Sequence, residues 1–175
     1  VDGLRAADIS FDNVKVDATN VLGAADDGLR VLNQIIDEAI IAVCAEAVGA
    51  LQHLHEATLE YVKTRKQFGL PIAKFQVIQH RLVDMYVALE LARSMTLLAA
   101  AGMGSANAQE RARLASTAKV KVGEAIRLVG QDAVQLHGGM GMTDELDVSH
   151  YFKRVTMIDA SFGDVDHHLR RLTTL

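Results

Sequence analysis

The sequence has little of what stabilises small β-sheet or disulfide-rich proteins. It contains no tryptophan, one proline and one cysteine among 175 residues, and aromatic residues make up only 5% of it, whereas 50% of the residues are hydrophobic. This composition is typical of long helices rich in Ala and Leu. The cysteine, Cys44, lies in an apolar run, so we expect a buried residue, no disulfides and a cytoplasmic location.

Further absences argue against other classes of function. No long run of Lys or Arg is present and the formal net charge is -4, which argues against a nucleic-acid partner. No apolar run is long enough to span a membrane, and no signal sequence is recognisable. The histidines His53 and His55 are two residues apart, a spacing unlike that of metal ligands on a helix, so we expect no metal site. Because the chain starts at Val1 without a methionine, we expect a fragment of a longer protein.

Hydrophobic residues recur every three or four positions over most of the chain, which predicts amphipathic helices. Three long helices are expected at about 27–64, 75–101 and 107–137, with shorter ones at about 144–157 and from 164. Asp26 or Asp27 would supply the N-cap oxygen of the first helix, and Asn107 would open a capping box for the third. Short connections between long helices predict an all-α, up-and-down bundle.

The buried faces of the three long helices follow from the same periodicity. On the first helix they are Leu32, Ile35, Ile36, Ala39, Ile40, Val43, Ala47, Leu51 and Leu54. On the second they are Phe75, Ile78, Leu82, Met85, Leu89, Ala92 and Leu98. On the third they are Leu114, Ala118, Val122, Ile126, Val129, Ala133 and Leu136. The four basic residues within 111–121 are expected on a solvated face of the third helix.

The first 23 residues follow a different pattern. Residues 9–16 alternate apolar and polar around Asp12-Asn13, which predicts two short strands. So short a segment cannot bury a sheet face by itself. We therefore expect residues 1–23 to be the end of a preceding β domain, and 24–175 to be the helical domain.

The segment Arg65-Lys66-Gln67-Phe68-Gly69-Leu70-Pro71-Ile72 separates the first two predicted helices. Cations suit the negative end of a helix dipole, glycine permits a backbone conformation that other residues resist, and proline cannot lie inside a helix. A helix end followed by a turn therefore accounts for the glycine and the proline. It does not account for the spacing of the other distinctive residues, which are Arg65, Gln67, Phe68, Phe75 and Gln76.

A second informative segment covers residues 131–143, where Gln135 and Leu136 precede His137 and the pair Gly138-Gly139. One interpretation is a helix end followed by a flexible glycine turn. The other is a ligand site, because a carboxamide makes directional hydrogen bonds and glycines let backbone donors approach a ligand closely. A guanidinium elsewhere in such a site would pair with a diphosphate.

Together the two segments resemble those of flavin-dependent acyl-CoA dehydrogenases, and the resemblance extends from about Gly3 to the C-terminus. In that family the first segment contacts the flavin dinucleotide (FAD) of a neighbouring subunit, and the second contacts the adenosine part of that flavin. The resemblance implies FAD as the cofactor and α,β-dehydrogenation of an acyl-CoA as the reaction. It also implies a homo- or heterotetramer, an electron-transfer flavoprotein as partner, and this chain as the C-terminal helical domain. The implied cofactor-binding residues are Arg65, Gln67, Phe68, Phe75, Gln76, Gln135, Leu136, Gly138 and Gly139.

The residues that would move a proton depart from the family pattern. Aligned through Gly163, the usual base, a glutamate, falls on Phe162, and the next threonine of the family falls on Asp164. The alternative base position on the first helix falls on Ala39, and a nearby family arginine falls on Ile40. Because phenylalanine and alanine cannot accept a proton, the candidate base by position is Asp164.

The nearby carboxylates also have ordinary explanations. Asp164 would serve as the N-cap of the last helix, and Asp37 and Glu38 would belong to a polar stripe of the first. The tail 161–169 resembles that of a bacterial subgroup with small or heteromeric subunits. Three hypotheses therefore stay open: a catalytic subunit, a catalytically silent partner that completes the flavin site and the tetramer, and a helical interaction module without a cofactor.

Overall fold

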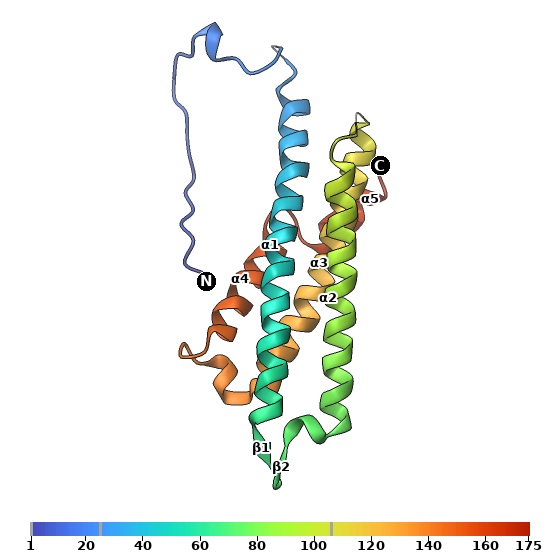
Figure 1. The fold of residues 1–175 in the computed structure, drawn as a ribbon. Helices are drawn as coiled ribbons and strands as arrows, with labels where there is room; N and C mark the ends of the chain where they lie inside the picture. Colours follow the sequence, from blue (N-terminus) through green and yellow to red (C-terminus); the bar gives the residue numbers. More distant parts are fainter. Residues whose placement is uncertain (1, 25, 106) are drawn as a thin grey trace.

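The computed structural model describes residues 2–24, 26–105 and 107–175, and helices dominate this part of the chain (Figure 1). They are α1 (Gly28–Thr64), α2 (Gln76–Gly102), α3 (Ala108–His137), α4 (Asp147–Ala160) and α5 (Val165–Leu172). Helices α1, α2 and α3 lie side by side in alternating directions, and α3 packs against each of the other four. The prediction of an all-α, up-and-down bundle is confirmed.

The core lies between α1, α2 and α3, where apolar side chains are excluded from solvent. Cys44 is fully buried there, as predicted, and burial raises the pKa of its thiol to about 12. Three residues assigned to the buried faces, Leu32, Ile35 and Leu98, are instead exposed. Periodicity identifies an apolar face but not which part of it another helix covers, so these three assignments are wrong for the described chain.

The expected strands at residues 9–16 do not form among the described residues. This segment is extended and exposed, with only a short 3-10 turn, η1 (Ala18–Asn20), before α1. A strand needs a partner for its backbone groups, and none of the described segments supplies one. The N-terminal segment is tied to α4 through Asp2, whose carboxylate accepts a hydrogen bond from Arg154 Nη1 at 2.7 Å.

The connection between α1 and α2 is a small hairpin rather than an open hinge. Strand β1 (Lys66–Gln67) pairs antiparallel with β2 (Leu70–Pro71), and η2 (Ile72–Lys74) then leads into α2. Phe68 and Gly69 form the two-residue loop with φ angles of 54° and 80°. A tight hairpin turn needs positive φ at both positions, which explains the glycine.

The predicted N-caps are found at α3 and α5 but not at α1. Asn107 Oδ1 accepts from the backbone N–H groups of Gln109 and Glu110, but the Glu110 carboxylate pairs with Arg113, so only half of the predicted capping box forms. Asp164 caps α5 by accepting the His167 backbone N–H. Asp27, in contrast, pairs with Arg30 and makes no cap hydrogen bond. Helix α4 starts three residues later than predicted, at Asp147, because the preceding residues form a 3-10 turn, η3 (Gly138–Met142), and a short loop.

The Asn107 cap gives a modest, testable contribution to stability. We expect Asn107→Ala to lower the free energy of unfolding by about 1 kcal/mol, because two backbone N–H groups at the start of α3 lose their acceptor. Urea-induced unfolding followed by circular dichroism measures this change. Asn107→Ser keeps an acceptor oxygen and should lose much less, and an equal loss in both variants would contradict the assignment.

Candidate functional site

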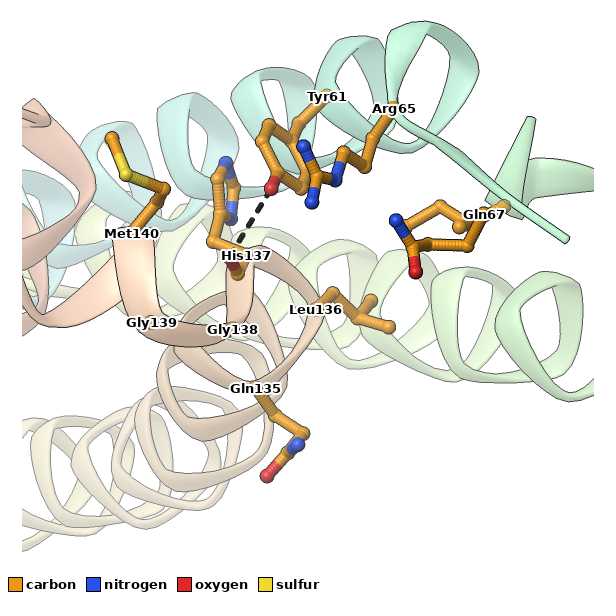
Figure 2. Close-up of a pocket in the computed structure, with 10 residues that line it drawn as sticks. Tyr61, Arg65, Gln67, Gln135, Leu136, His137, Gly138, Gly139 and Met140 are labelled. Carbon is orange, nitrogen blue, oxygen red and sulfur yellow. Dashed lines mark hydrogen bonds between the residues drawn. The ribbon is translucent and has the colours of Figure 1, made fainter. Parts of the chain in front are cut away.

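The two informative segments meet at one end of the bundle, in a cleft of about 510 Å³ (Figure 2). One wall comes from the end of α1 and the hairpin, and the other from the end of α3 and the start of η3. Segments that are about 70 residues apart in the sequence therefore face one another. The lining residues are Tyr61, Arg65, Gln67, Ile72, Gln135, Leu136, His137, Gly138, Gly139 and Met140.

Arg65 supplies the positive charge of this cleft. Its backbone N–H donates to the Tyr61 carbonyl and so ends α1, and its side chain extends along the cleft toward the end of α3 (Figure 2). Among the described residues, no acidic side chain pairs with its guanidinium. The guanidinium therefore keeps its five donors for an anionic ligand.

Tyr61 and His137 form the inner wall of the cleft, and we did not predict this role for either. Their rings stack with centroids 4.3 Å apart, and Tyr61 Oη donates to the His137 carbonyl at 3.3 Å. His137 is buried and its Nδ1 donates to the Ala133 carbonyl at 2.8 Å. The sequence held a signal for Tyr61, because it precedes Arg65, the C-cap residue of α1, by four residues, about one helical turn.

The paired glycines leave room at the mouth of the cleft. Gly138 ends α3 with φ 61° and ψ -141°, a conformation that side chains resist. A Cβ atom added at Gly138 or Gly139 would meet no heavy atom within 4 Å. Open space therefore lies beside this backbone, and a ligand can approach it closely. Gly141 differs, because a Cβ there would lie 2.7 Å from the Val134 carbonyl oxygen.

Gln135 lines three neighbouring cavities. Its exposed side chain points away from Arg65 in Figure 2, and it also lines a second cavity of about 530 Å³ next to Met142 and Phe152. The carboxamide can therefore contact the part of a ligand that extends past the glycines, and not the part that lies beside Arg65.

Three residues predicted as cofactor contacts do not line the cleft. Phe68 is 90% exposed at the hairpin tip and packs edge-on against Phe75, with ring centroids 6.1 Å apart. Phe75 occupies the N-cap position of α2, and Gln76 is the first residue of that helix. The structure thus places Phe68, Phe75 and Gln76 beside the hairpin, and their contacts with a cofactor stay predictions.

The 161–164 turn, which holds the candidate base, lies at the other end of α4 from the cleft (Figure 1). The Asp164 carboxylate accepts the His167 backbone N–H at 2.8 Å, and this bond holds the pKa of Asp164 below its usual value. A carboxylate committed to a helix cap and kept ionised is a poor proton acceptor. Phe162 is 46% exposed, and Ala39 lies on α1 with only a methyl group.

Several charged residues assigned to solvated faces are instead buried. Asp37 is buried and its Oδ1 accepts from Arg171 Nη2 at 2.7 Å, whereas Glu38 remains on the polar face of α1. Arg111 and Lys119 of α3 are also buried, so the solvated-face prediction is wrong for these two. Basic residues are mostly exposed in proteins, so the sequence pattern favoured a solvated face, but Arg111 and Lys119 are buried with backbone carbonyls as partners.

The described residues carry neither a membrane-spanning helix nor a metal cluster. None of their helices combines the length and apolar character that a membrane crossing needs. The described residues also contain no group of three or more His, Cys, Asp or Glu side chains arranged to hold a metal ion.

Comparison with known proteins gives a consistent result. The family described as "Acyl-CoA dehydrogenase, C-terminal domain" matches residues 26–173. Acyl-CoA dehydrogenase IpdE2 from Mycobacterium tuberculosis is 38% identical over 120 residues, which cover 69% of this chain and 36% of the relative. The human mitochondrial short-chain specific acyl-CoA dehydrogenase is 31% identical over 160 residues, covering 90% of this chain and 38% of the relative.

Solved structures show the same fold. Butyryl-CoA dehydrogenase from Megasphaera elsdenii superimposes with a TM-score of 0.86 at 30% identity, covering 94% of this chain and 42% of that one. The chain therefore spans well under half the length of each of these proteins.

Proposed function

Because this chain belongs to the acyl-CoA dehydrogenase family and matches its C-terminal domain, we propose that it is the helical domain of a flavin-dependent acyl-CoA dehydrogenase. In this proposal FAD lies where two subunits meet, and Arg65 with the Gln135–Gly139 segment contacts the cofactor held mainly by the neighbouring subunit. The single observation that carries the proposal is the convergence of these two segments on one cleft.

The residues of the cleft fit a dinucleotide. The Arg65 guanidinium has no acidic partner among the described residues, and it matches a diphosphate in charge and geometry. The space beside Gly138 and Gly139 admits a ligand against the backbone, and the Gln135 carboxamide offers donors and an acceptor to an adenosine. When bound, FAD supplies the chemistry of accepting a hydride from the acyl chain.

Features outside the cleft support an assembly around this domain. Exposed apolar side chains in the N-terminal segment, among them Ile9 and Phe11, suit packing against a preceding β domain. An exposed apolar row on α2, including Val83, Val87 and Leu91, suits contacts between subunits of a tetramer. By family analogy the electron acceptor is an electron-transfer flavoprotein, and the single buried Cys44 suits the cytoplasm.

Arg65→Ala tests the flavin contact. We expect it to weaken FAD binding by the full-length protein by about 10- to 100-fold, because one charge-assisted interaction with the diphosphate is lost. FAD released on dilution, followed by fluorescence, measures the change. The matched control is Lys66→Ala, which removes the adjacent positive charge outside the cleft and should retain FAD. Equal FAD retention in the two variants would remove the basis of the proposal.

A second candidate function is a silent partner subunit. It is favoured by the absence of a proton acceptor at Phe162 and Ala39 and by the commitment of Asp164 to the α5 cap. Such a subunit would complete a flavin site while another polypeptide supplies the base. Mixing the full-length protein with acyl-CoA, with and without its partner subunit, distinguishes the two, because only a catalytic subunit bleaches its flavin alone.

A further inference from the structure

Two exposed methionines lie together in the turn that follows α3. All six methionines of the chain fall within the described residues, and only Met140 and Met142 among them are exposed, at 41% and 71%. Met85, in contrast, is 0% exposed in the core. Methionine is typically a buried residue that fills irregular gaps in a core. Packing therefore does not explain why both exposed methionines occur in one turn.

Gly141, which lies between them, fixes this turn against α3. Gly141 is buried, and a Cβ atom added there would lie 2.7 Å from the Val134 carbonyl oxygen, so no side chain fits. The Met140 carbonyl oxygen accepts from the backbone N–H of Thr143 at 3.2 Å and from the Thr143 hydroxyl at 2.9 Å. The backbone of η3 is thus held in place, and the residues on either side of Gly141 carry exposed side chains.

Each methionine borders a different cavity. Met140 lines the cleft that contains Arg65, and it lies on the far side of His137 from Arg65 (Figure 2). Met142 lines the second cavity together with Gln135 and the paired glycines. A ligand that runs along the cleft and past the glycines would therefore cover both thioethers.

A thioether that is open to solvent is a target for oxidation by hydrogen peroxide. A lone pair of the sulfur attacks one peroxide oxygen, the O–O bond breaks, and the products are one methionine sulfoxide and one water. The sulfur loses two electrons and the peroxide gains them. The reaction converts a flexible apolar side chain into a polar one, and methionine sulfoxide reductases reverse it.

We propose that Met140 and Met142 form a paired oxidation site, through which hydrogen peroxide lowers the affinity of the cleft for its dinucleotide. The identity of this ligand as FAD rests on the proposed function. A sulfoxide oxygen is hydrated, and burying it without a hydrogen-bond donor is costly, so a ligand that covers the oxidised turn binds more weakly. Bound FAD in turn shields both sulfurs. Oxidation is therefore fastest in protein without FAD and hinders its reloading.

Peptide mapping tests the site in the full-length protein with and without FAD. The tryptic peptide 128–153 contains Met140 and Met142 and no other methionine, and the peptide 82–93 contains only Met85. In protein stripped of FAD, we expect hydrogen peroxide to oxidise 128–153 at least about 10-fold faster than 82–93, because the Met85 sulfur is buried. Saturating FAD should slow the oxidation of 128–153, and mass spectrometry measures both rates.

Two results of the mapping would overturn the proposal. One is equal oxidation of the two peptides, which would show that the turn is not selectively reactive. The other is equal oxidation of peptide 128–153 with and without bound FAD, which would show that the ligand does not cover the methionines.

FAD binding before and after oxidation tests the consequence for the cleft. We expect peroxide to weaken FAD binding by the unaltered full-length protein by about 5- to 50-fold, because two polar oxygens are added beside the ligand. Fluorescence of FAD released on dilution measures the change. Treatment with methionine sulfoxide reductases should restore the original affinity.

The matched control is the double variant Met140→Leu/Met142→Leu, compared with itself before and after peroxide. Leucine is apolar and has no sulfur, so peroxide should not change the FAD affinity of this variant. An equal loss in both proteins would assign the effect to other residues, and no loss in either would remove the consequence, so each result overturns the proposal. Failure of the proposed function is distinct, because it would appear as equal FAD retention in Arg65→Ala and Lys66→Ala.

Discussion

On the silent-partner hypothesis, Phe162→Glu is expected to give the full-length protein an acyl-CoA-dependent bleaching of its flavin that the unaltered protein lacks when tested without a partner subunit. The substitution places a carboxylate at the position where the family resemblance expects the base. The backbone there is held by Lys119 and His168, so the new side chain would leave the turn in the direction of the present ring. A general base contributes about 10²- to 10⁴-fold in rate, which sets the expected size of the gain.

The matched control for this experiment is Phe162→Gln. It has nearly the same shape as the glutamate but cannot accept a proton, so it should stay inactive. Stopped-flow absorbance after mixing with acyl-CoA provides the measurement. Rapid bleaching by the unaltered protein alone would contradict the silent-partner hypothesis. It would show that another carboxylate of the full-length protein serves as the base.

We expect His168 to make the free energy of unfolding fall steeply as the pH is lowered. Burial lowers the pKa of His168 from 6.5 to about 4, and the nearby charge of Lys119 acts in the same direction. Between pH 6.5 and about pH 4, His168 is therefore protonated in the unfolded chain but neutral in the folded chain. The stabilisation is complete above about pH 6.5 and is lost at about 1.4 kcal/mol per pH unit as the pH falls toward 4. The total loss over this window is about 3 kcal/mol.

His168→Gln isolates this contribution because glutamine does not titrate. Between pH 7 and pH 5, urea-induced unfolding should show the unaltered protein losing about 2 kcal/mol more than the variant. Carboxylates with lowered pKa values, such as Glu46 and Asp164, lose stabilisation only at more acidic pH and are common to both proteins. An identical pH dependence in the two proteins would contradict the buried, neutral state of His168.

Much of the fold could be predicted from the sequence because its signals are local. The three long helices follow from apolar spacing, and α2 and α3 end at glycines as expected. Whether residues 9–16 form strands could not be predicted from local sequence, because a strand needs a pairing partner that lies elsewhere. The hairpin at Lys66–Pro71 was missed because two paired residues on each side leave no alternation to detect.

Some residues of the candidate site could be identified from the sequence and others could not. Arg65 and Gln135 were identified from the two segments and the family they resemble, and the structure brings both to one cleft. His137 was not, because its role depends on stacking against Tyr61 from another helix. Lys119 was assigned to the wrong environment for a related reason. Its partners are the backbone carbonyls of Asp159 and Gly163, and backbone groups leave no residue-specific trace in a sequence.

The central place of α3 has a consequence for synthesis on the ribosome. Helices α1 and α2 are made first, yet much of their apolar surface is covered by α3, which begins only at Ala108. Until α3 has left the ribosomal exit tunnel, the nascent chain therefore exposes the apolar faces of two long helices. Protection by a holding chaperone matters most in this interval, and it ends when the last long helix emerges and closes the bundle.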